Sequence, residues 1–141
     1  MTKLVQGIGV NNKEYPAYIN GKVTAVYDVW KGILYRCTKK FWIKHPTYTG
    51  TTCSDSFKDF SVFYKWYNEQ PNSSKKDVSG NKWELDKDLL VKGNRHYSES
   101  TCVFVPARIN SLLNKREAAR GESLIGAYFD KKSEKYKAMC N

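Results

Sequence analysis

The residues of this 141-residue chain that could do chemistry are two histidines, four cysteines and one acid–lysine–acid triplet. The triplet is Asp86-Lys87-Asp88, and His96 follows Lys87 by nine positions. An exposed lysine with its ordinary pKa of about 10.4 is protonated at pH 7, and two flanking carboxylates favour that charged form. The triplet therefore predicts a fixed cation at Lys87 rather than a general base.

The sequence contains no strong metal-binding pattern. The cysteines stand at positions 37, 53, 102 and 140, so none forms a C-x-x-C pair. His45 is followed by Pro46 and has no acid or cysteine at ligand spacing, which favours a structural or surface role. We expect the cysteines to be buried or free thiols of a reducing compartment.

The elements that must position the triplet lie within residues 82–116. The pattern predicts a strand at Trp83–Asp86, a polar loop that turns at Gly93-Asn94, and a second strand at Thr101–Val105. Pro106 then opens a helix, a position that proline tolerates. The apolar face of this helix carries Ile109, Leu112 and Leu113. Because such a ββα unit is too small to form its own core, the rest of the chain should pack around it.

This segment resembles the ββα-metal core of HNH endonucleases, in the version found in small phage-borne homing-endonuclease-like proteins. The resemblance covers about a quarter of the chain. It rests on four motifs: Trp83-Glu84-Leu85-Asp86-Lys87-Asp88-Leu89-Leu90, Gly93-Asn94-Arg95-His96-Tyr97-Ser98, Cys102-Val103-Phe104-Val105-Pro106 and Ile109-Asn110-Ser111-Leu112-Leu113.

The resemblance implies roles for individual residues. In that family a histidine takes a proton from the attacking water, and a divalent metal held partly by a helix residue stabilises the leaving oxygen. By position, Lys87 stands where the catalytic histidine belongs, Asn94 corresponds to the loop asparagine, and Asp86 with Asn110 would hold the metal. The replacement of histidine by lysine predicts a degenerate catalytic centre, with His96 as a substitute base only in principle.

The net charge of +10 is unevenly distributed. Residues 1–50 carry +6, residues 51–106 are neutral, and residues 107–141 carry +4. A folded surface with this excess attracts polyanions. Lys39-Lys40-Phe41-Trp42 interleaves cations with aromatic rings, as nucleic-acid surfaces do, although an ordinary helix end has the same composition. The candidate binding residues are Arg36, Lys39, Lys40, Trp83, Asn94, Arg95, Tyr97, Arg108, Arg116 and Arg120.

Elsewhere the sequence predicts an α+β fold of short β-hairpins and three helices around the ββα core. Residues 15–26 predict a hairpin around a type I′ turn at Asn20-Gly21. Asp28 is expected to cap a helix from Val29 to Thr38, and Thr51–Cys53 to form a short strand. Asp55 or Ser54 should cap a helix whose aromatic stripe belongs to the core. The stripe comprises Phe57, Phe60, Phe63, Tyr64 and Tyr67, and a polar loop at 68–80 should follow it.

Residues 124–138 predict a further β-hairpin, which resembles the first two strands of an AP2-type DNA-binding sheet. The chain stops at Asn141, before a third strand, so the resemblance implies a truncated version. We expect an HNH-like domain at 1–121 with the AP2-like hairpin, at 122–141, packed on it. No apolar run approaches 18 residues and no signal peptide is evident, which predicts a cytoplasmic protein without membrane contact, in the host cytoplasm if it is phage-encoded.

Three functional hypotheses follow. The favoured one is a phage-type relative of HNH endonucleases that binds nucleic acid without efficient cleavage and needs no cofactor. The second is a binder of a small anionic (cyclic) nucleotide, which would sequester a signal of host antiviral defence in a basic pocket edged by Trp83, Asn94 and Tyr97. The third is an active Mg²⁺-dependent endonuclease, with His96 or a deprotonated Lys87 as its base. Homo-oligomerisation is left open by the sequence.

Overall fold

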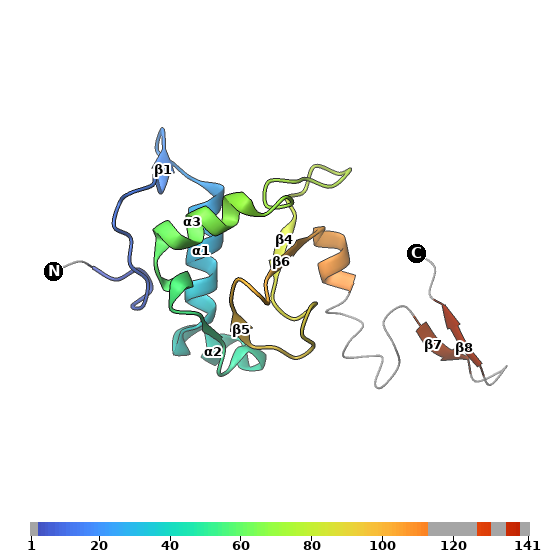
Figure 1. The fold of residues 1–141 in the computed structure, drawn as a ribbon. Helices are drawn as coiled ribbons and strands as arrows, with labels where there is room; N and C mark the ends of the chain where they lie inside the picture. The colour runs from blue at the N-terminus through green and yellow to red at the C-terminus, as the bar shows by residue number, and fades with distance from the viewer. Residues whose placement is uncertain (1–2, 113–126, 131–134, 139–141) are drawn as a thin grey trace.

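Helix α1 (Ala25–Arg36) lies in the middle of residues 3–112, with α3 and α2 packed against it and β4 and β6 to one side (Figure 1). The structure is a computed structural model that describes residues 3–112, 127–130 and 135–138. Residues 3–112 form a mixed α/β unit of short helices and two-stranded sheets. The predicted α+β class is confirmed at this level.

The chain enters α1 through the predicted hairpin. Strands β1 (Tyr18–Ile19) and β2 (Lys22–Val23) pair antiparallel, and Asn20 and Gly21 both have the positive φ of a type I′ turn. The predicted start of the helix was wrong, because Thr24 rather than Asp28 caps it. The extended backbone of Thr24 lets its hydroxyl accept a hydrogen bond from Tyr27 N at 3.3 Å. Asp28 instead lies in the first turn, where a carboxylate suits the helix dipole.

After α1 the chain turns into a short helix that the sequence did not predict. Helix α2 (Lys39–Lys44) is capped by Thr38, whose hydroxyl accepts from Phe41 N. The 3₁₀ helix η1 (Pro46–Tyr48) follows. Phe41 lies 5.1 Å from the Tyr48 ring, and the Trp42 indole donates to the carbonyl of Arg36. These contacts fold α2 and η1 back against the carboxyl end of α1.

Helix α3 (Phe60–Glu69) packs across α1, and its cap also differs from the prediction. Residues Ser56–Lys58 form a separate 3₁₀ helix, η2, and Asp59 caps α3 by accepting from Ser61 N at 2.8 Å. Neither Asp55 nor Ser54 is the cap, because the intervening 3₁₀ turn moves the helix start by several residues. Helix α3 runs to Glu69, so the polar loop begins later than predicted.

The core is aromatic, as the stripe predicted. Trp30 of α1 is fully buried, and its indole donates to the Phe57 carbonyl at 2.7 Å. The Phe60 ring lies 5.0 Å from that of Trp30, joining α3 to α1. The buried aromatic residues of this core are Tyr27, Trp30, Phe57, Phe60, Phe63, Trp66, Tyr67, Tyr97 and Phe104. Tyr64, predicted as part of the stripe, is only partly buried and stacks on Tyr15 at 3.9 Å.

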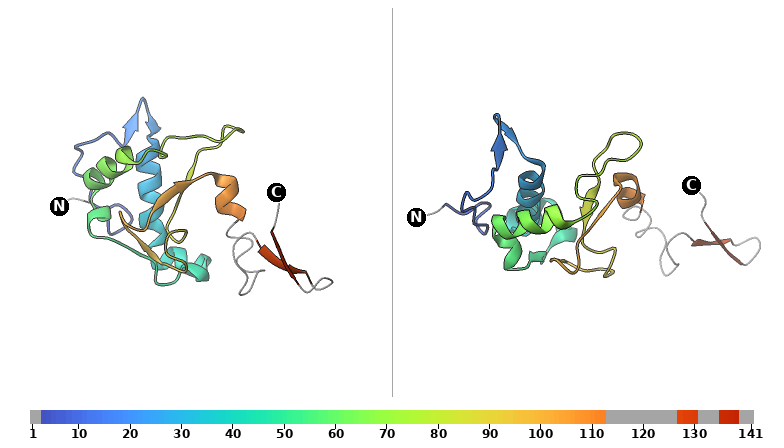
Figure 2. Two further views of the ribbon diagram at one scale, coloured as in Figure 1. Left: turned by 45° about the vertical axis from the view of Figure 1, so that its right-hand side comes forward. Right: turned by 45° about the horizontal axis from the view of Figure 1, so that its top comes forward.

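Strands β4 (Glu84–Asp86) and β6 (Val103–Val105) pair antiparallel, and residues 107–112 are helical immediately after β6. The strands are shorter than predicted, but their order, strand–loop–strand–helix, is the one expected. Figures 1 and 2 place residues 107–112 on the side of the β4–β6 pair away from α1 and α3. Residues 113–121 of the expected helix lie outside the described residues.

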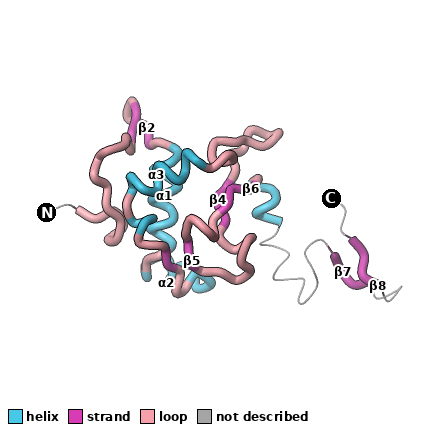
Figure 3. The backbone as a smooth tube through the Cα atoms, viewed as in Figure 1, coloured by secondary structure: helices cyan, strands magenta, loops and turns pink. Residues whose placement is uncertain are grey.

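The loop between β4 and β6 contains a strand that the sequence did not reveal. Strand β5 (His96–Tyr97) pairs in parallel with β3 (Thr52–Cys53), which confirms the short strand predicted there. Figure 3 shows that loops make up much of the chain around these short strands. Among the described residues, no helix combines the length and apolar character required to cross a bilayer.

A separate hairpin is formed by β7 (Ala127–Asp130) and β8 (Lys135–Ala138), with Tyr128 opposite Lys137. The hairpin predicted at 124–138 is thus confirmed in its two strands. Its likeness to an AP2 sheet and the domain boundary at residue 121 stay predictions.

Gly9→Ala should destabilise the fold, because a Cβ at this position would lie 2.2 Å from Leu34 Cδ1 and 2.9 Å from Trp30 Cζ2. Overpacking of this kind costs about 1–3 kcal/mol. Gly32→Ala is the matched control: its Cβ would meet only Arg36 Nη1, at 3.6 Å, within α1. This control should raise the free energy of unfolding by about 0.5–1 kcal/mol. Urea titration measures both, and equal effects of the two variants would contradict the packing described for Gly9.

Candidate functional site

A groove of about 1030 Å³ runs between α1 and β4. Its walls include Tyr35 and Arg36 of α1, Tyr48 of η1, and Tyr97 of β5. Helical residues 107–112 contribute Ala107 and Asn110, so the groove is lined by β4, by the segment that follows β4 and by the helical residues after β6. Its charged lining residues are four cations, Lys31, Arg36, Lys82 and Lys87, and four acids, Asp28, Glu84, Asp86 and Asp88. The groove is therefore mixed in charge rather than the basic pocket that the sequence predicted.

Lys87 lies in this groove with its amine between two tyrosines. Its Nζ is 5.5 Å from the centre of the Tyr48 ring and 5.6 Å from that of Tyr97, both within cation–π range. The Asp88 carboxylate is 3.6 Å away, and only 12 % of the Lys87 side chain is exposed. Burial raises the pKa of the Tyr97 hydroxyl, which keeps that ring neutral beside the amine. These neighbours suit a fixed cation.

Asp86 is buried at the end of β4, and its carboxylate is occupied by the backbone of the following loop. Its Oδ2 accepts hydrogen bonds from Leu89 N at 2.6 Å and Asp88 N at 3.1 Å. Burial raises the pKa of the Asp86 carboxyl, and the neighbouring Asp88 carboxyl raises it further; the two N–H groups oppose this shift only in part. Asp86 thus shapes the loop.

Asn94 closes the same loop. Its amide Nδ2 donates to the carbonyl of Lys87 at 2.8 Å and to that of His96 at 2.7 Å, while its Oδ1 accepts from His96 N. One side chain therefore bridges the two ends of the segment, as expected for a bracing residue. Asn94 does not line the groove, although Trp83 and Tyr97 do.

The Lys75 amine lies 5.2 Å from the centre of the Trp83 ring. The buried indole N–H of Trp83 has no hydrogen-bond partner among the described residues.

The two residues predicted to hold a metal, Asp86 and Asn110, both line the groove, and each has another hydrogen-bond partner. The Asn110 amide donates to Glu84 Oε2 at 2.8 Å, whereas Asp86 Oδ2 faces backbone N–H groups. Within residues 3–112, 127–130 and 135–138, no three His, Cys, Asp or Glu residues are grouped so that they could hold a metal ion. Asp86 and Asn110 are thus each engaged by other protein groups, and a metal held by them stays a prediction.

His96 belongs to strand β5, and His45 follows the last residue of α2. His96 Nδ1 is 2.8 Å from the Thr52 hydroxyl, in the parallel pairing of β3 with β5. His45 stacks on the Phe41 ring at 4.3 Å. His96 is not among the residues that line the groove containing Lys87.

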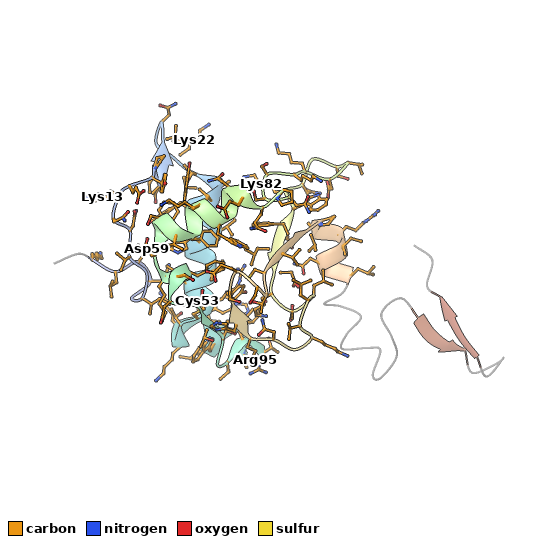
Figure 4. The ribbon with its side chains drawn as sticks, viewed as in Figure 1. Lys13, Lys22, Cys53, Asp59, Lys82 and Arg95 are labelled. Atoms are coloured by element: carbon orange, nitrogen blue, oxygen red, sulfur yellow. The ribbon has the colours of Figure 1, made fainter. Side chains whose placement is uncertain are left out.

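Several predicted binding residues gather at the carboxyl end of α1. Arg36 closes α1, Lys39 and Lys40 are exposed in the first turn of α2, and Arg95 donates to the Thr49 carbonyl at 2.6 Å beside η1. We name these four residues the α1-end basic surface. Figure 4 labels Arg95 at this end of the molecule, while Lys13 and Lys22 lie towards the opposite end.

The second predicted group of cations is described only in part. Arg108, in helical residues 107–112, contributes to lowering the pKa of Asp77 and so lies near the loop that precedes β4. Lys82, labelled in Figure 4, belongs to the same region. Arg116 and Arg120 lie outside the described residues.

Sequence reasoning missed two features of the site. Tyr48, which faces Lys87, is distant from it in sequence, and only the aromatic–basic composition of residues 39–48 signalled that segment. Cys37 and Cys53 are neighbours outside the groove lining, and the interaction with Cys53 raises the pKa of Cys37. Their separation in sequence gave no sign of the pairing. Cys102 is buried separately, and burial raises its pKa to about 12.

Comparison with known proteins adds no relative: no protein-family model, curated protein or solved structure matches the chain significantly.

Asp86→Asn should change how stability depends on pH. Between the ordinary aspartate pKa of about 3.9 and the raised folded value, the unfolded chain has lost a proton that the folded protein keeps. The free energy of unfolding of the wild type therefore falls as the pH rises through this window. Asparagine does not titrate, so the variant should gain stability relative to the wild type as the pH rises through this window.

Urea titrations at a series of pH values measure this difference. Asp77→Asn is the matched control, because hydrogen bonds from the backbone of Asn81 and Ser79 lower the Asp77 pKa. This variant should lose stability relative to the wild type as the pH rises. The free energy of unfolding of each variant, relative to that of the wild type, is plotted against pH. If the two plots had the same slope, the burial of a carboxyl with a raised pKa at Asp86 would be contradicted.

Proposed function

We propose that this chain binds nucleic acid on an HNH-like ββα scaffold whose catalytic centre is degenerate. The observation that carries the proposal is Lys87: its amine lies between Tyr48 and Tyr97, at the position where the resemblance expects a catalytic histidine. A protonated amine cannot take a proton from water. The order β4–loop–β6–helix and the bracing contacts of Asn94 support the relation to that scaffold.

The α1-end basic surface supports phosphate binding. Lys39 and Lys40 stand in the first turn of α2, which contains no acid. Cations at the amino end of a helix oppose its dipole, at a cost of about 0.3–1 kcal/mol each. Neither lysine forms an ion pair with a described residue. Since the fold gains nothing evident from them, contact with a polyanion supplies a reason for their presence.

The groove favours a second candidate, binding of a small anionic nucleotide. Its volume of about 1030 Å³ is at the upper end of ligand pockets, and Tyr35, Tyr48 and Trp83 offer rings on which a base could stack. Lys87 and Arg36 would then meet the phosphates. The four acids in the lining weigh against this candidate, and we rank it below nucleic acid.

Duplex DNA should bind with a strong dependence on salt, because each neutralised phosphate releases counterion. Replacing both Lys39 and Lys40 by alanine should weaken binding and reduce the slope of log affinity against log salt by up to about 2. Fluorescence anisotropy between about 50 and 200 mM salt measures the slope.

The matched control replaces Lys13 and Lys22, which removes the same charge from the other end of the molecule (Figure 4). This control should leave the slope close to that of the wild type. If both double variants lost the same affinity for DNA, the loss would come from net charge alone and not from the α1-end basic surface. Weak duplex binding, with one nucleotide raising the melting temperature by several degrees, would instead favour the groove as a nucleotide site.

Supercoiled plasmid with Mg²⁺ should not be nicked efficiently by the wild-type chain, since Lys87 is a poor base and no metal-ligand cluster is described around it. Asn110→Ala should therefore behave as the wild type does in a gel assay for open-circular DNA. Robust nicking that disappears in Asn110→Ala would establish the active-endonuclease alternative and overturn the degenerate one.

A further inference from the structure

The loop of residues 87–94 is held in a fixed shape by hydrogen bonds from both of its ends. At its start, Asp86 Oδ2 accepts from the N–H groups of Asp88 and Leu89. At its end, Asn94 N donates to the Val91 carbonyl at 3.0 Å, and the Asn94 amide reaches back to Lys87 O at 2.8 Å. Gly93 adopts a φ of 74°, which allows the turn.

This preorganised loop presents apolar side chains to solvent. Leu89 is 40 % exposed, Leu90 59 % and Val91 49 %, and the three are consecutive in sequence. We name them the apolar tip. Single exposed apolar residues are common, but an ordered loop that holds three neighbouring ones in water marks an interaction site.

The charges around the apolar tip indicate what it contacts. Residues 89–98 contain Lys92 and Arg95 but no acid. The two acids that precede the tip are already engaged, Asp86 by backbone N–H groups and Asp88 by Lys87 at 3.6 Å. An apolar tip followed directly by cations matches a ligand that pairs an anionic backbone with stacked, apolar surfaces, which is the composition of a duplex.

We propose that the apolar tip is a wedge that enters between stacked base pairs while Lys92 and Arg95 hold the flanking phosphates. Leucine is among the side chains that architectural proteins use in this way, unstacking a base step and bending the duplex. Rigidity favours this role, since a loop that is already ordered loses little further entropy on insertion. The inference rests on the proposed nucleic-acid function and adds that the preferred substrate is a duplex that is easily unstacked.

The experiment uses the full chain and short duplexes that contain 2-aminopurine, whose fluorescence rises when it is unstacked. Binding of the wild type should raise the 2-aminopurine fluorescence several-fold. It should also bend the duplex and so increase the energy transfer between dyes attached to its two ends. A single mismatch beside the probe should tighten binding about tenfold, because less stacking energy must be given up.

Leu90→Ser and a triple serine variant of the apolar tip should abolish the fluorescence rise and the mismatch preference, with the salt dependence of binding retained. Leu90→Ser alone removes a largely exposed side chain, so it tests the wedge even where the triple variant does not fold. Ile19→Ser is the matched control, because Ile19 is 56 % exposed and lies in β1 at the other end of α1. This control should behave as the wild type does.

The outcomes separate the wedge from the function on which it rests. Salt-dependent binding without unstacking, or unstacking that survives in Leu90→Ser, would overturn the wedge and leave the proposed function standing. Absence of duplex binding would overturn both. Leu90-dependent binding to phosphatidylserine vesicles, or Leu90-dependent self-association in sedimentation, would assign the apolar tip to a membrane surface or to a second copy of the chain instead.

Discussion

Packing of Phe104 against α3 is the contact on which the arrangement of the site depends. The Phe104 ring lies 6.0 Å from that of Trp66 in a stacked geometry and 5.3 Å from that of Tyr67 edge-on. These contacts hold β6 against α3. Because β4 pairs with β6, they also hold β4, which forms part of the groove wall. A short two-stranded ribbon is only marginally stable in water by itself, so its position relative to α1 comes from this aromatic contact rather than from the ribbon.

A second anchor acts from the other side of the loop. Parallel pairing of β3 with β5 places Tyr97 beside the carboxyl end of α1, and Arg95 reaches the Thr49 carbonyl from the same segment. The Lys87 amine therefore lies between a ring held by β5 and a ring held by η1. Together the two anchors explain how a chain with so much loop places its charged residues in defined positions.

The sequence predicted the elements with strong local signals, and it failed where distant residues decide. Asn20-Gly21 requires a tight hairpin, and the aromatic spacing of Phe60 and Phe63 requires a buried helix face, so both predictions hold. Helix starts were misplaced because Thr24 and Asp59 compete with other good caps nearby, and tertiary packing chooses among them. Strand β5 could not be foreseen, because its partner β3 is more than forty residues away.

The candidate site divides in the same way. Local pattern was enough to single out Asp86, Lys87 and Asn94, yet the roles of the first two depend on their surroundings. Asp86 uses its carboxylate to accept backbone N–H groups, and Lys87 is enclosed by Tyr48 and Tyr97, which the sequence did not link to it. The polar side chains of Asp86 and Asn94 hold the loop of residues 87–94. The same hydrogen bonds that remove Asp86 from chemistry keep Leu89 to Val91 in a fixed, exposed arrangement. Under the proposed function, this one set of contacts would serve binding and not catalysis.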